Sequence, residues 1–487
     1  MDPFFVIAVL LFYFLLLVGI SWITSRGADD NAYFLGSKKS PWIAVAFGML
    51  GDSLSGVTFI SVPGAVEKGD FSYLQLVFGY FAGYFVISEI LLPLYYKMNL
   101  TSIYSYLGVR IGPKAEKTGS VFFLISRLLG AGGRLYLAAG VIHYFVLKQL
   151  NIPFSISVSI IIILILVYTL KGGIRTLVWT DVLQSGILLL AVILSIYAIQ
   201  KNMEIGFGEM VSRIANDSNS TTFFWDWTQK SFFFKMFIGG MLTSIAMTGL
   251  DQNMMQKNLS LKTLGEAQKN IRSFSFVMMI VNLFFLSLGV LIYQYYAQSH
   301  IPLPLNATGD VIPDKVFPEL ALNHLGSFAG IVFILGLTAA TFSSADSVLT
   351  TLTTSFYIDI LKMDQQSRSE QEKRKWRNGI HIGFAIALLL VILIFEAMNN
   401  DAIINTILTV AAYTYGPLLG LFFFGILSKR KANDSLVPYF SLAAPVICYI
   451  LSMYSKSFFD GYEFGYELLG LNGLLVYAGL HFTSEKA

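Results

Sequence analysis

Apolar runs of roughly 18 or more residues recur along the chain, and no other feature constrains its fold as strongly. Each run is long enough, as an α-helix, to cross the roughly 30 Å hydrocarbon core of a bilayer. Charged residues form only 13% of the chain, whereas soluble domains carry about 25%. The sequence therefore predicts an all-α polytopic membrane protein that has the lipid bilayer as its solvent.

The apolar runs divide into thirteen predicted transmembrane helices. Their approximate ranges are 4–25, 41–65, 71–96, 119–147, 153–170, 177–200, 232–251, 273–297, 326–361, 378–398, 402–427, 436–454 and 464–482. We interpret the first run as a retained span, because it is too long for a cleavable signal and no basic segment precedes it.

Most of the 33 Lys and Arg residues fall in alternate connections between these spans. Because cytoplasmic loops are enriched in Lys and Arg, this bias places the N-terminus outside and the C-terminus in the cytoplasm. We predict a multi-pass protein of the plasma (inner) membrane. The net charge of +3 gives no indication of nucleic-acid binding, and the single Cys448 excludes an internal disulfide framework.

The second predicted span is interrupted near its middle by GMLGDSLSG, residues 48–56. Three glycines and several polar residues disfavour a continuous helix there, so we predict an unwound break. Irregular backbone at membrane depth survives only where it is buried or lines a cavity. Its freed carbonyls can bind a cation, while Ser53, Ser55 and Thr58 can face a solute. The alternative is a packing kink that the glycines allow.

The seventh span shows the same pattern, with Gly239 and Gly240 followed by hydroxyl residues and Gly249. Two glycine-interrupted spans that lie five spans apart are typical of an inverted-repeat transporter. We therefore predict a five-plus-five inverted-repeat core. The predicted division of the chain is an N-terminal extra helix and loop (1–40), the core (41–430, with repeats 41–200 and 232–427) and two peripheral C-terminal helices (431–487).

The ninth span carries a crowd of hydroxyls and one acid between Ala339 and Ser355. On a helix, Ala340, Ser343, Ser344 and Ser347 share one stripe, and Asp346 lies beside it. A stripe of small residues alone indicates close helix packing. A carboxylate among hydroxyls at membrane depth favours an oxygen cage for a small hard cation.

The fourth span holds Arg127 and Arg134, about two helical turns apart on one face. Either guanidinium suits an internal acid or the carboxylate of a substrate. We assign the first role to Arg127 and the second to Arg134. Asp181 at the start of the sixth span fits a simple cap or a pair with Arg175, unless another acid lies opposite.

Several ordered motifs resemble the sodium:solute symporter family, which includes sodium/sugar, sodium/proline and sodium/sialic acid transporters. The resemblance extends from about Tyr33 to Lys429. It rests on YFLGSKKSPW (33–42), GGIRTLVWTDVLQ (172–184), GLDQNMMQKNLS (249–260), SSADS (343–347) and YGPLLGLFFFGIL (415–427). The resemblance implies the same five-plus-five fold and sodium as the coupling ion.

The resemblance also implies specific binding residues. A first sodium site would use the carbonyls of Gly51, Leu54 and Ala340 and the hydroxyls of Ser343 and Ser344. A possible second sodium site would use Asp181, Ser343, Asp346 and Ser347. Solute contacts would fall on Ser53, Ser55, Thr58, Gln75, Arg134 and Asp251. Asp346 departs from members with serine there, so it either strengthens cation binding or takes up a proton.

The sequence thus predicts a sodium-coupled symporter that imports a small polar organic solute, such as a sugar or sialic acid, by alternating access. The alternative is a proton-coupled or sodium-independent transporter of a small organic acid or amino acid. A channel would need a repeated filter or ring of charges, and an intramembrane enzyme would need a nucleophile with a base. We expect no enzyme activity, nucleic-acid partner or obligate protein partner.

Overall fold

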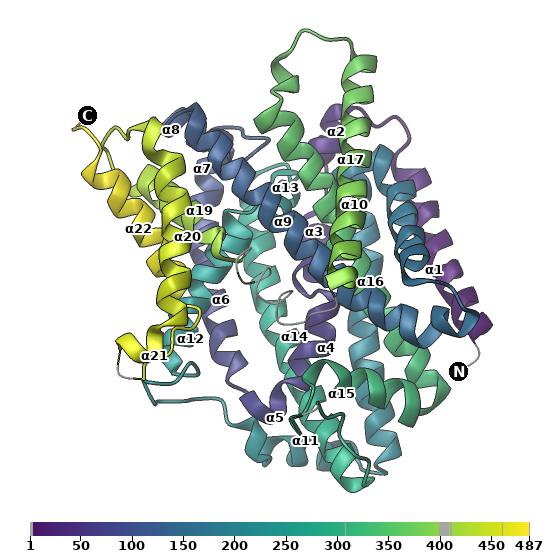
Figure 1. Cartoon of the computed structure of the whole chain (residues 1–487). Coiled ribbons are helices and arrows are strands. Elements are labelled where there is room, and N and C mark those ends of the chain that lie inside the picture. Colours follow the sequence, from purple (N-terminus) through teal and green to yellow (C-terminus); the bar gives the residue numbers. More distant parts are fainter. Residues whose placement is uncertain (1–2, 307, 399–408, 410–411, 460, 487) are drawn as a thin grey trace.

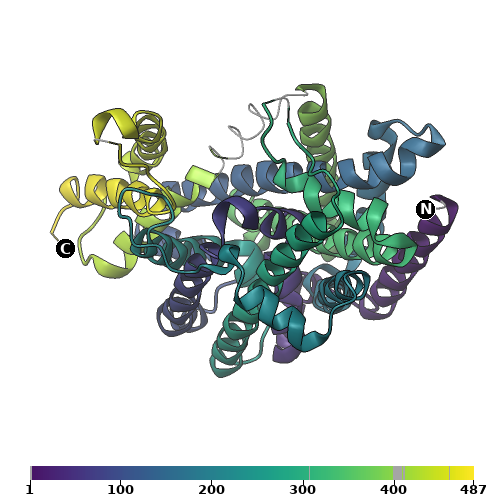
Figure 2. The same cartoon turned by 90° about the horizontal axis from the view of Figure 1, so that it is seen from below.

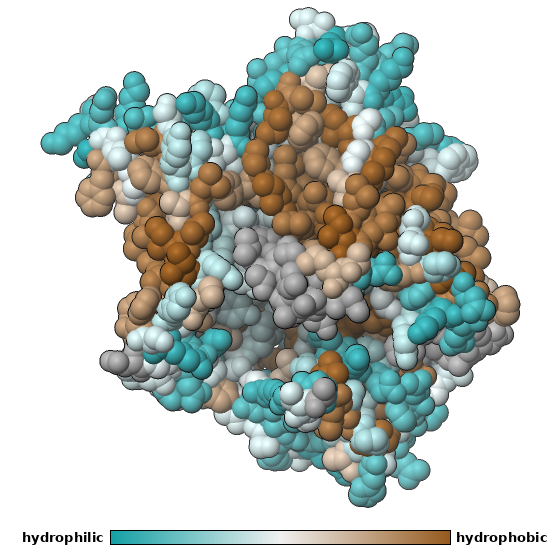
Figure 3. All heavy atoms as spheres, in the orientation of Figure 1, coloured by the Kyte–Doolittle hydropathy of each residue, from teal (hydrophilic) through white to brown (hydrophobic). Residues whose placement is uncertain are grey.

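The computed structural model describes residues 3–306, 308–398, 409, 412–459 and 461–486. In these ranges the regular structure is helical, and β pairing is confined to two isolated bridges. Most helices run roughly along one direction (Figure 1). Hydrophobic surface covers the middle of the molecule, while hydrophilic residues gather at its upper and lower ends (Figure 3). This distribution fits a molecule whose middle lies in a bilayer.

Among the residues that the structure describes, eight single helices are long and apolar enough to cross a membrane. They are α1 (Pro3–Thr24), α6 (Tyr73–Val86) with its continuation α7 (Leu92–Lys97), α9 (Pro113–Ile142), α10 (Phe154–Asn202), α14 (Leu264–Gln298), α16 (Gly326–Ser355), α17 (Glu370–Met398) and α20 (Val437–Met453). Two bent pairs raise the number to ten. The shorter apolar helices α19 (Tyr415–Leu427) and α22 (Leu468–Phe482) complete the set.

The fifth and sixth predicted spans form the single 49-residue helix α10. The chain bends at Gly173, where φ is 50° and ψ is −138°. A side chain there would be strained at that φ, and its Cβ would lie 2.4 Å from the carbonyl oxygen of Tyr33. With α10 counted as two spans, the predicted segments all match helices. The start of the eleventh, 402–408 and 410–411, lies outside the described residues.

The break predicted in the second span is confirmed. Helix α3 (Trp42–Ser53) and helix α4 (Gly56–Gly64) meet at 61°. Leu54 leaves the helical region, with φ −94° and ψ 77°. The Ser55 hydroxyl then accepts the N–H of Thr58 at 3.4 Å and caps α4. A serine N-cap replaces the missing backbone acceptor, which explains why the new helix begins at this residue.

The seventh span is broken as predicted, but the bend lies after Gly249, at the end of the predicted stretch, and not at Gly239 and Gly240. Helix α12 (Phe233–Ser244) runs straight through Gly239 and Gly240, and the bend of 62° comes before α13 (Gln252–Leu259). Gly240 instead permits close contact with α6, since a Cβ on it would lie 2.2 Å from the carbonyl oxygen of Leu76. Asp251 caps α13 by accepting the N–H of Asn253 at 2.9 Å.

The connections separate into two groups at opposite ends of the molecule. Helices α5 (Val66–Gly69), α11 (Phe207–Ala215) and α15 (Pro313–Glu319) belong to connections predicted outside, and all three lie at the lower end of Figure 1. Helices α2 (Asp30–Leu35) and α8 (Ser105–Arg110) belong to connections predicted inside and lie toward the upper end. The predicted alternation of the spans is therefore present in the fold.

Helix α16 lies in the interior, and every residue from Gly336 to Ser355 is buried. It contacts α10, α9, α3, α4 and α17. Seen from below, α1 and the C-terminal helices α19, α20 and α22 lie at opposite ends of the molecule (Figure 2). The stretch with the most hydroxyls in the chain is thus surrounded by protein rather than lipid.

Candidate functional site

The broken second span meets α16 closely at the place where the first sodium site is predicted. A Cβ on Gly51 would lie 2.6 Å from Ser343 Oγ, and one on Gly56 would lie 2.3 Å from Thr341 Oγ1. Leu54, Ala340 and Ser343 are fully buried. The fold therefore brings the broken second span against α16, although the two segments are roughly 300 residues apart in the chain.

The oxygen atoms in this region are available to a cation. Among the described residues, no backbone N–H bonds to the carbonyl oxygen of Gly51 or Leu54, because the break removes the next helical turn. Ser344 Oγ donates to Thr341 O at 3.0 Å, and Ser343 Oγ donates to Asp181 Oδ1 at 3.1 Å. Each hydroxyl keeps lone pairs while it donates. The predicted set of Gly51, Leu54, Ala340, Ser343 and Ser344 thus fits a monovalent cation, and it stays a prediction.

A buried ion cluster that the sequence did not reveal lies beside this region. Lys257 Nζ is 2.5 Å from both Asp52 Oδ2 and Asp181 Oδ2, and all three side chains are at most 1% exposed. Asp181 therefore pairs with Lys257 rather than with Arg175. Residues 252–260 are buried, although the sequence had placed them in a cytoplasmic connection. Lys257 belongs to the motif GLDQNMMQKNLS (249–260), but its two partners lie in distant segments of the chain, so the sequence did not indicate the pairing.

The residues of the possible second sodium site lie on α10 and α16. Ser343 bonds to Asp181 directly, while Asp346 Oδ2 accepts from the Tyr168 hydroxyl at 2.7 Å. Asp346 Oδ1 and Ser347 Oγ are buried without a hydrogen-bond partner in the described structure. Buried oxygens in that state fit a cation. The second site likewise stays a prediction.

A cavity of about 200 Å³ lies between the broken spans. Its lining residues are Asp52, Ser53, Leu54, Thr58, Tyr73, Tyr80, Tyr84, Arg127, Arg134, Thr243, Ser244, Met247, Thr248, Met254 and Met278. Ser53, Thr58 and Arg134 were predicted to contact a solute. The sequence did not single out the other hydroxyl residues of this lining, Tyr73, Tyr80 and Tyr84 of α6 and Thr243 and Thr248, as solute contacts, because tyrosine and threonine in apolar helices occur equally in packed interiors.

Three predicted solute residues do not line this cavity. Ser55 caps α4. The Gln75 amide fixes an outer loop, since its nitrogen donates to Ser231 O at 2.9 Å and its oxygen accepts the N–H of Phe224 at 3.2 Å. Asp251 is fully buried and binds Arg127. In each case a neighbouring backbone group or charge binds the polar side chain.

The two arginines of α9 have different surroundings. Arg127 Nε donates to Asp251 Oδ2 at 2.7 Å, and the Tyr415 hydroxyl donates to the same oxygen at 3.0 Å. Arg127 thus neutralises an internal acid, as predicted. Arg134 is half-buried and faces the cavity, and within the described ranges no carboxylate lies within ion-pair distance of it. Its charge is available to a solute.

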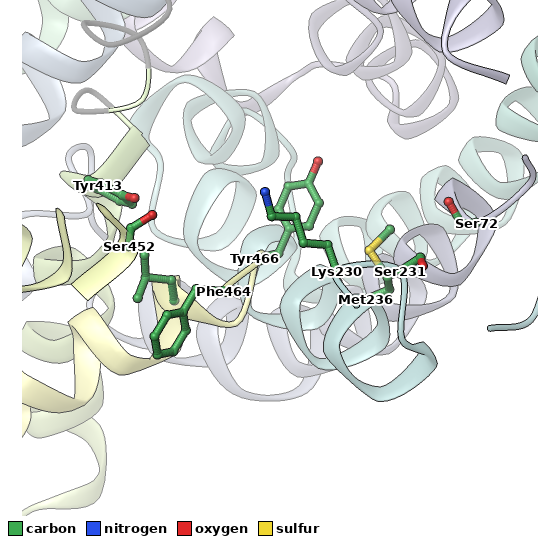
Figure 4. Close-up of a pocket in the computed structure, with 10 residues that line it drawn as sticks. Ser72, Lys230, Ser231, Met236, Tyr413, Ser452, Phe464 and Tyr466 are labelled. Carbon is green, nitrogen blue, oxygen red and sulfur yellow. The ribbon is translucent and has the colours of Figure 1, made fainter. Parts of the chain in front are cut away.

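A wider outer cavity of about 460 Å³ lies at the end of the molecule that carries the predicted outside connections. Lys230 and Ser231 line it from the loop before α12, and Tyr466 and Phe464 line it from the segment before α22 (Figure 4). The C-terminal region was predicted to be peripheral. The structure shows that its helices are peripheral but that the segment between them forms part of this wall.

Comparison with known proteins decides the class of this chain. The sequence profile of the sodium:solute symporter family matches residues 33–435. The chain belongs to the sodium:solute symporter family. This membership confirms the resemblance seen in the motifs and the predicted class, a sodium-coupled symporter of a small solute.

Several characterised members are similar over most of their length. The sodium/sialic acid symporter NanT of Aliivibrio fischeri is 28% identical over 87% of this chain and 82% of its own. The sodium/sialic acid symporter SiaT of Proteus mirabilis is 25% identical over 87% and 84%. The human sodium-coupled monocarboxylate transporter 1 is 25% identical over 84% and 67%. These relatives are transporters rather than enzymes.

The fold is also that of solved symporters. The substrate-bound, outward-open structure of a Na⁺-coupled sialic acid symporter matches 99% of both chains with a TM-score of 0.83 at 21% identity. Mhp1, a nucleobase-cation-symport transporter solved in a closed conformation, matches 94% of this chain and 96% of its own with a TM-score of 0.57 at 14% identity. The five-plus-five arrangement predicted for this family member is therefore confirmed.

Proposed function

We propose that this symporter imports a small organic solute that carries a carboxylate and hydroxyl groups. The observation that carries the proposal is Arg134, a guanidinium without an acidic partner in the described structure, which faces a cavity lined by hydroxyls. A guanidinium matches a carboxylate with two parallel hydrogen bonds. The names of the relatives support this choice, since sialic acid and monocarboxylates are both carboxylic acids.

The cavity's other groups suit the rest of such a solute. Ser53, Thr58, Thr243 and Thr248 offer hydroxyls that both donate and accept. Tyr73, Tyr80 and Tyr84 of α6 add rings against which apolar faces of a sugar-like solute can lie. Polar groups placed among aromatic and apolar side chains are typical of small-molecule sites. Sialic acid combines the carboxylate with hydroxyls and is the first solute to test.

We propose that sodium couples to this solute through Gly51, Leu54, Ala340, Ser343 and Ser344. Sodium at these oxygens would join the broken α3–α4 pair to α16 and stabilise the conformation that binds solute from outside. An ion shifts such an equilibrium only through its different affinity for the two conformations. One inward-moving charge supplies about 2.3 kcal/mol for each 100 mV of membrane potential.

We place the chain in the plasma (inner) membrane with its N-terminus outside and its C-terminus in the cytoplasm. The distribution of Lys and Arg supports this orientation. We assign the two repeats to residues 41–200 and 232–427, because the two bent helix pairs occupy matching places in them. Residues 1–40 and 431–487 flank this core.

The alternative is a transporter that is coupled to protons instead of sodium. Asp346 Oδ1 is buried without a partner in the described structure, and a proton would satisfy it as well as a metal cation would. A transporter that uses Asp346 in this way would respond to a pH gradient and not to sodium.

The proposal is tested by uptake into proteoliposomes with a negative interior. Labelled sialic acid, lactate, glucose and proline are each offered with inward sodium, with choline in its place, and with an inward proton gradient in choline. We expect sodium-dependent accumulation of an acid, and sialic acid to exceed glucose. Accumulation that is equal in sodium and choline, or glucose uptake equal to that of the acids, would refute the proposal. Empty liposomes are the control.

A further inference from the structure

Lys257 is the point where three helices meet around one buried positive charge. It lies on α13, the short inner half of the second bent pair, and is 1% exposed. Its ammonium contacts Asp52 on α3 and Asp181 on α10, each at 2.5 Å. Asn253 of the same helix also donates to Asp52, at 3.4 Å. A lysine is seldom this buried unless it is paired, so its position is specific.

Each acid that Lys257 contacts leads directly to one half of the proposed sodium site. Asp52 follows Gly51 in the chain, and Gly51 supplies one proposed carbonyl ligand. The other oxygen of Asp181 accepts the hydroxyl of Ser343, a proposed ligand on α16. The ammonium thus holds both carboxylates beside the site without itself being a ligand.

Lys257 shares its single positive charge between two buried acids. Asp52, Asp181 and Asp346 are all buried, and in the described ranges Lys257 is the only cationic side chain that forms an ion pair with any of them. Two carboxylates, those of Asp52 and Asp181, share the one ammonium of Lys257, so carboxylate oxygens that attract a cation remain beside the proposed site. In an interior of low dielectric constant, the positive charge of Lys257 must weaken that attraction appreciably.

We propose that Lys257 is a positioning residue that sets the sodium affinity of the first site. Its charge offsets Asp52 and Asp181, which keeps sodium binding weak enough for the ion to leave on the cytoplasmic side. This inference rests on the proposed sodium site. The proposed role and a purely structural role predict opposite effects on sodium affinity. If Lys257 only held the ligands in place, its removal would loosen them and weaken sodium binding.

Sodium binding to the purified full-length chain, without solute, tests the sign. Labelled sodium is measured by scintillation proximity for the wild type, Lys257→Met, Asp52→Asn and the double variant. We expect Lys257→Met to lower the half-saturating sodium concentration by at least about threefold and Asp52→Asn to raise it by a similar factor. The half-saturating sodium concentration of the double variant should lie near the wild-type value, and so should that of Lys257→Arg.

Each result decides the inference. Weaker or unchanged sodium binding in Lys257→Met overturns it. Where Lys257→Met does not fold, the double variant is compared with Asp52→Asn, and binding that is not tighter in the double variant overturns it equally. A wild type that binds no sodium refutes the proposed function as well, whereas normal binding with the wrong sign in the variants refutes only the role of Lys257.

Discussion

Replacing Arg134 by glutamine should separate solute binding from folding. The substitution removes the positive charge and leaves a shorter, neutral polar side chain. In the described structure Arg134 pairs with no carboxylate, so its removal leaves no acid stranded in the interior. The folded protein should therefore tolerate the change, while the solute's carboxylate loses its partner.

The expected loss follows from the kind of bond that disappears. Hydrogen bonds to charged groups contribute about 1.5–3 kcal/mol each. Since about 1.4 kcal/mol corresponds to a factor of ten, one such bond predicts a rise of about 10- to 150-fold in the half-saturating solute concentration. The half-saturating sodium concentration, measured at saturating solute, should change far less, because Arg134 is not among the proposed sodium ligands.

The matched control is Arg127→Gln, two turns earlier on the same helix. Arg127 binds Asp251 at 2.7 Å, and Asp251 is fully buried. Breaking a buried ion pair by removing one partner costs about 3–5 kcal/mol. Arg127→Gln should therefore lower the melting temperature, whereas Arg134→Gln should leave it near the wild-type value.

The assay combines solute dependence of uptake in proteoliposomes with thermal unfolding of the same preparations. An Arg134→Gln variant with an unchanged half-saturating solute concentration would refute the assignment of Arg134. A large fall in its melting temperature would show that the residue has a structural partner instead. Lysine at the same position should recover part of the affinity, as a point charge without the second parallel hydrogen bond.

Three further predictions concern the ion sites and the packing. Ser344→Ala should raise the sodium concentration needed for half-maximal uptake several-fold with little change in expression, and unchanged sodium activation would count against Ser344 as a ligand. Asp181→Asn and Asp346→Asn should each lower the ratio of sodium to solute transported if the second site is used; a ratio that stays constant in both excludes that site. Gly240→Ala should lower the melting temperature, because its Cβ would lie 2.2 Å from a backbone oxygen, whereas Gly130→Ala, with nothing within 4 Å, should not.

The sequence alone determined the features that depend on local composition. The length of the apolar runs fixed the number and type of spans, since each helix satisfies its own backbone within one segment. The break at Leu54 was predictable because glycine and serine there weaken the helix and Ser55 can cap the next one. The family resemblance supplied the pairing of this break with Ser343 and Ser344.

The tertiary structure decided which polar residues satisfy one another. Gln75 and Asp251 were predicted to contact the solute. In the structure, Gln75 is hydrogen-bonded to an outer loop and Asp251 pairs with Arg127. Gly240 looked like a helix breaker, but it allows α12 to approach α6.

Lys257 is the clearest example of a contact that could not be predicted from the sequence. It lies 205 residues from Asp52 and 76 from Asp181, yet its ammonium joins both. Helix propensity and the length of an apolar run depend on residues close together in the chain, so both can be read from the sequence. Charge pairing acts through space, so it depends on the path of the chain between the partners, and only the folded structure specifies that path.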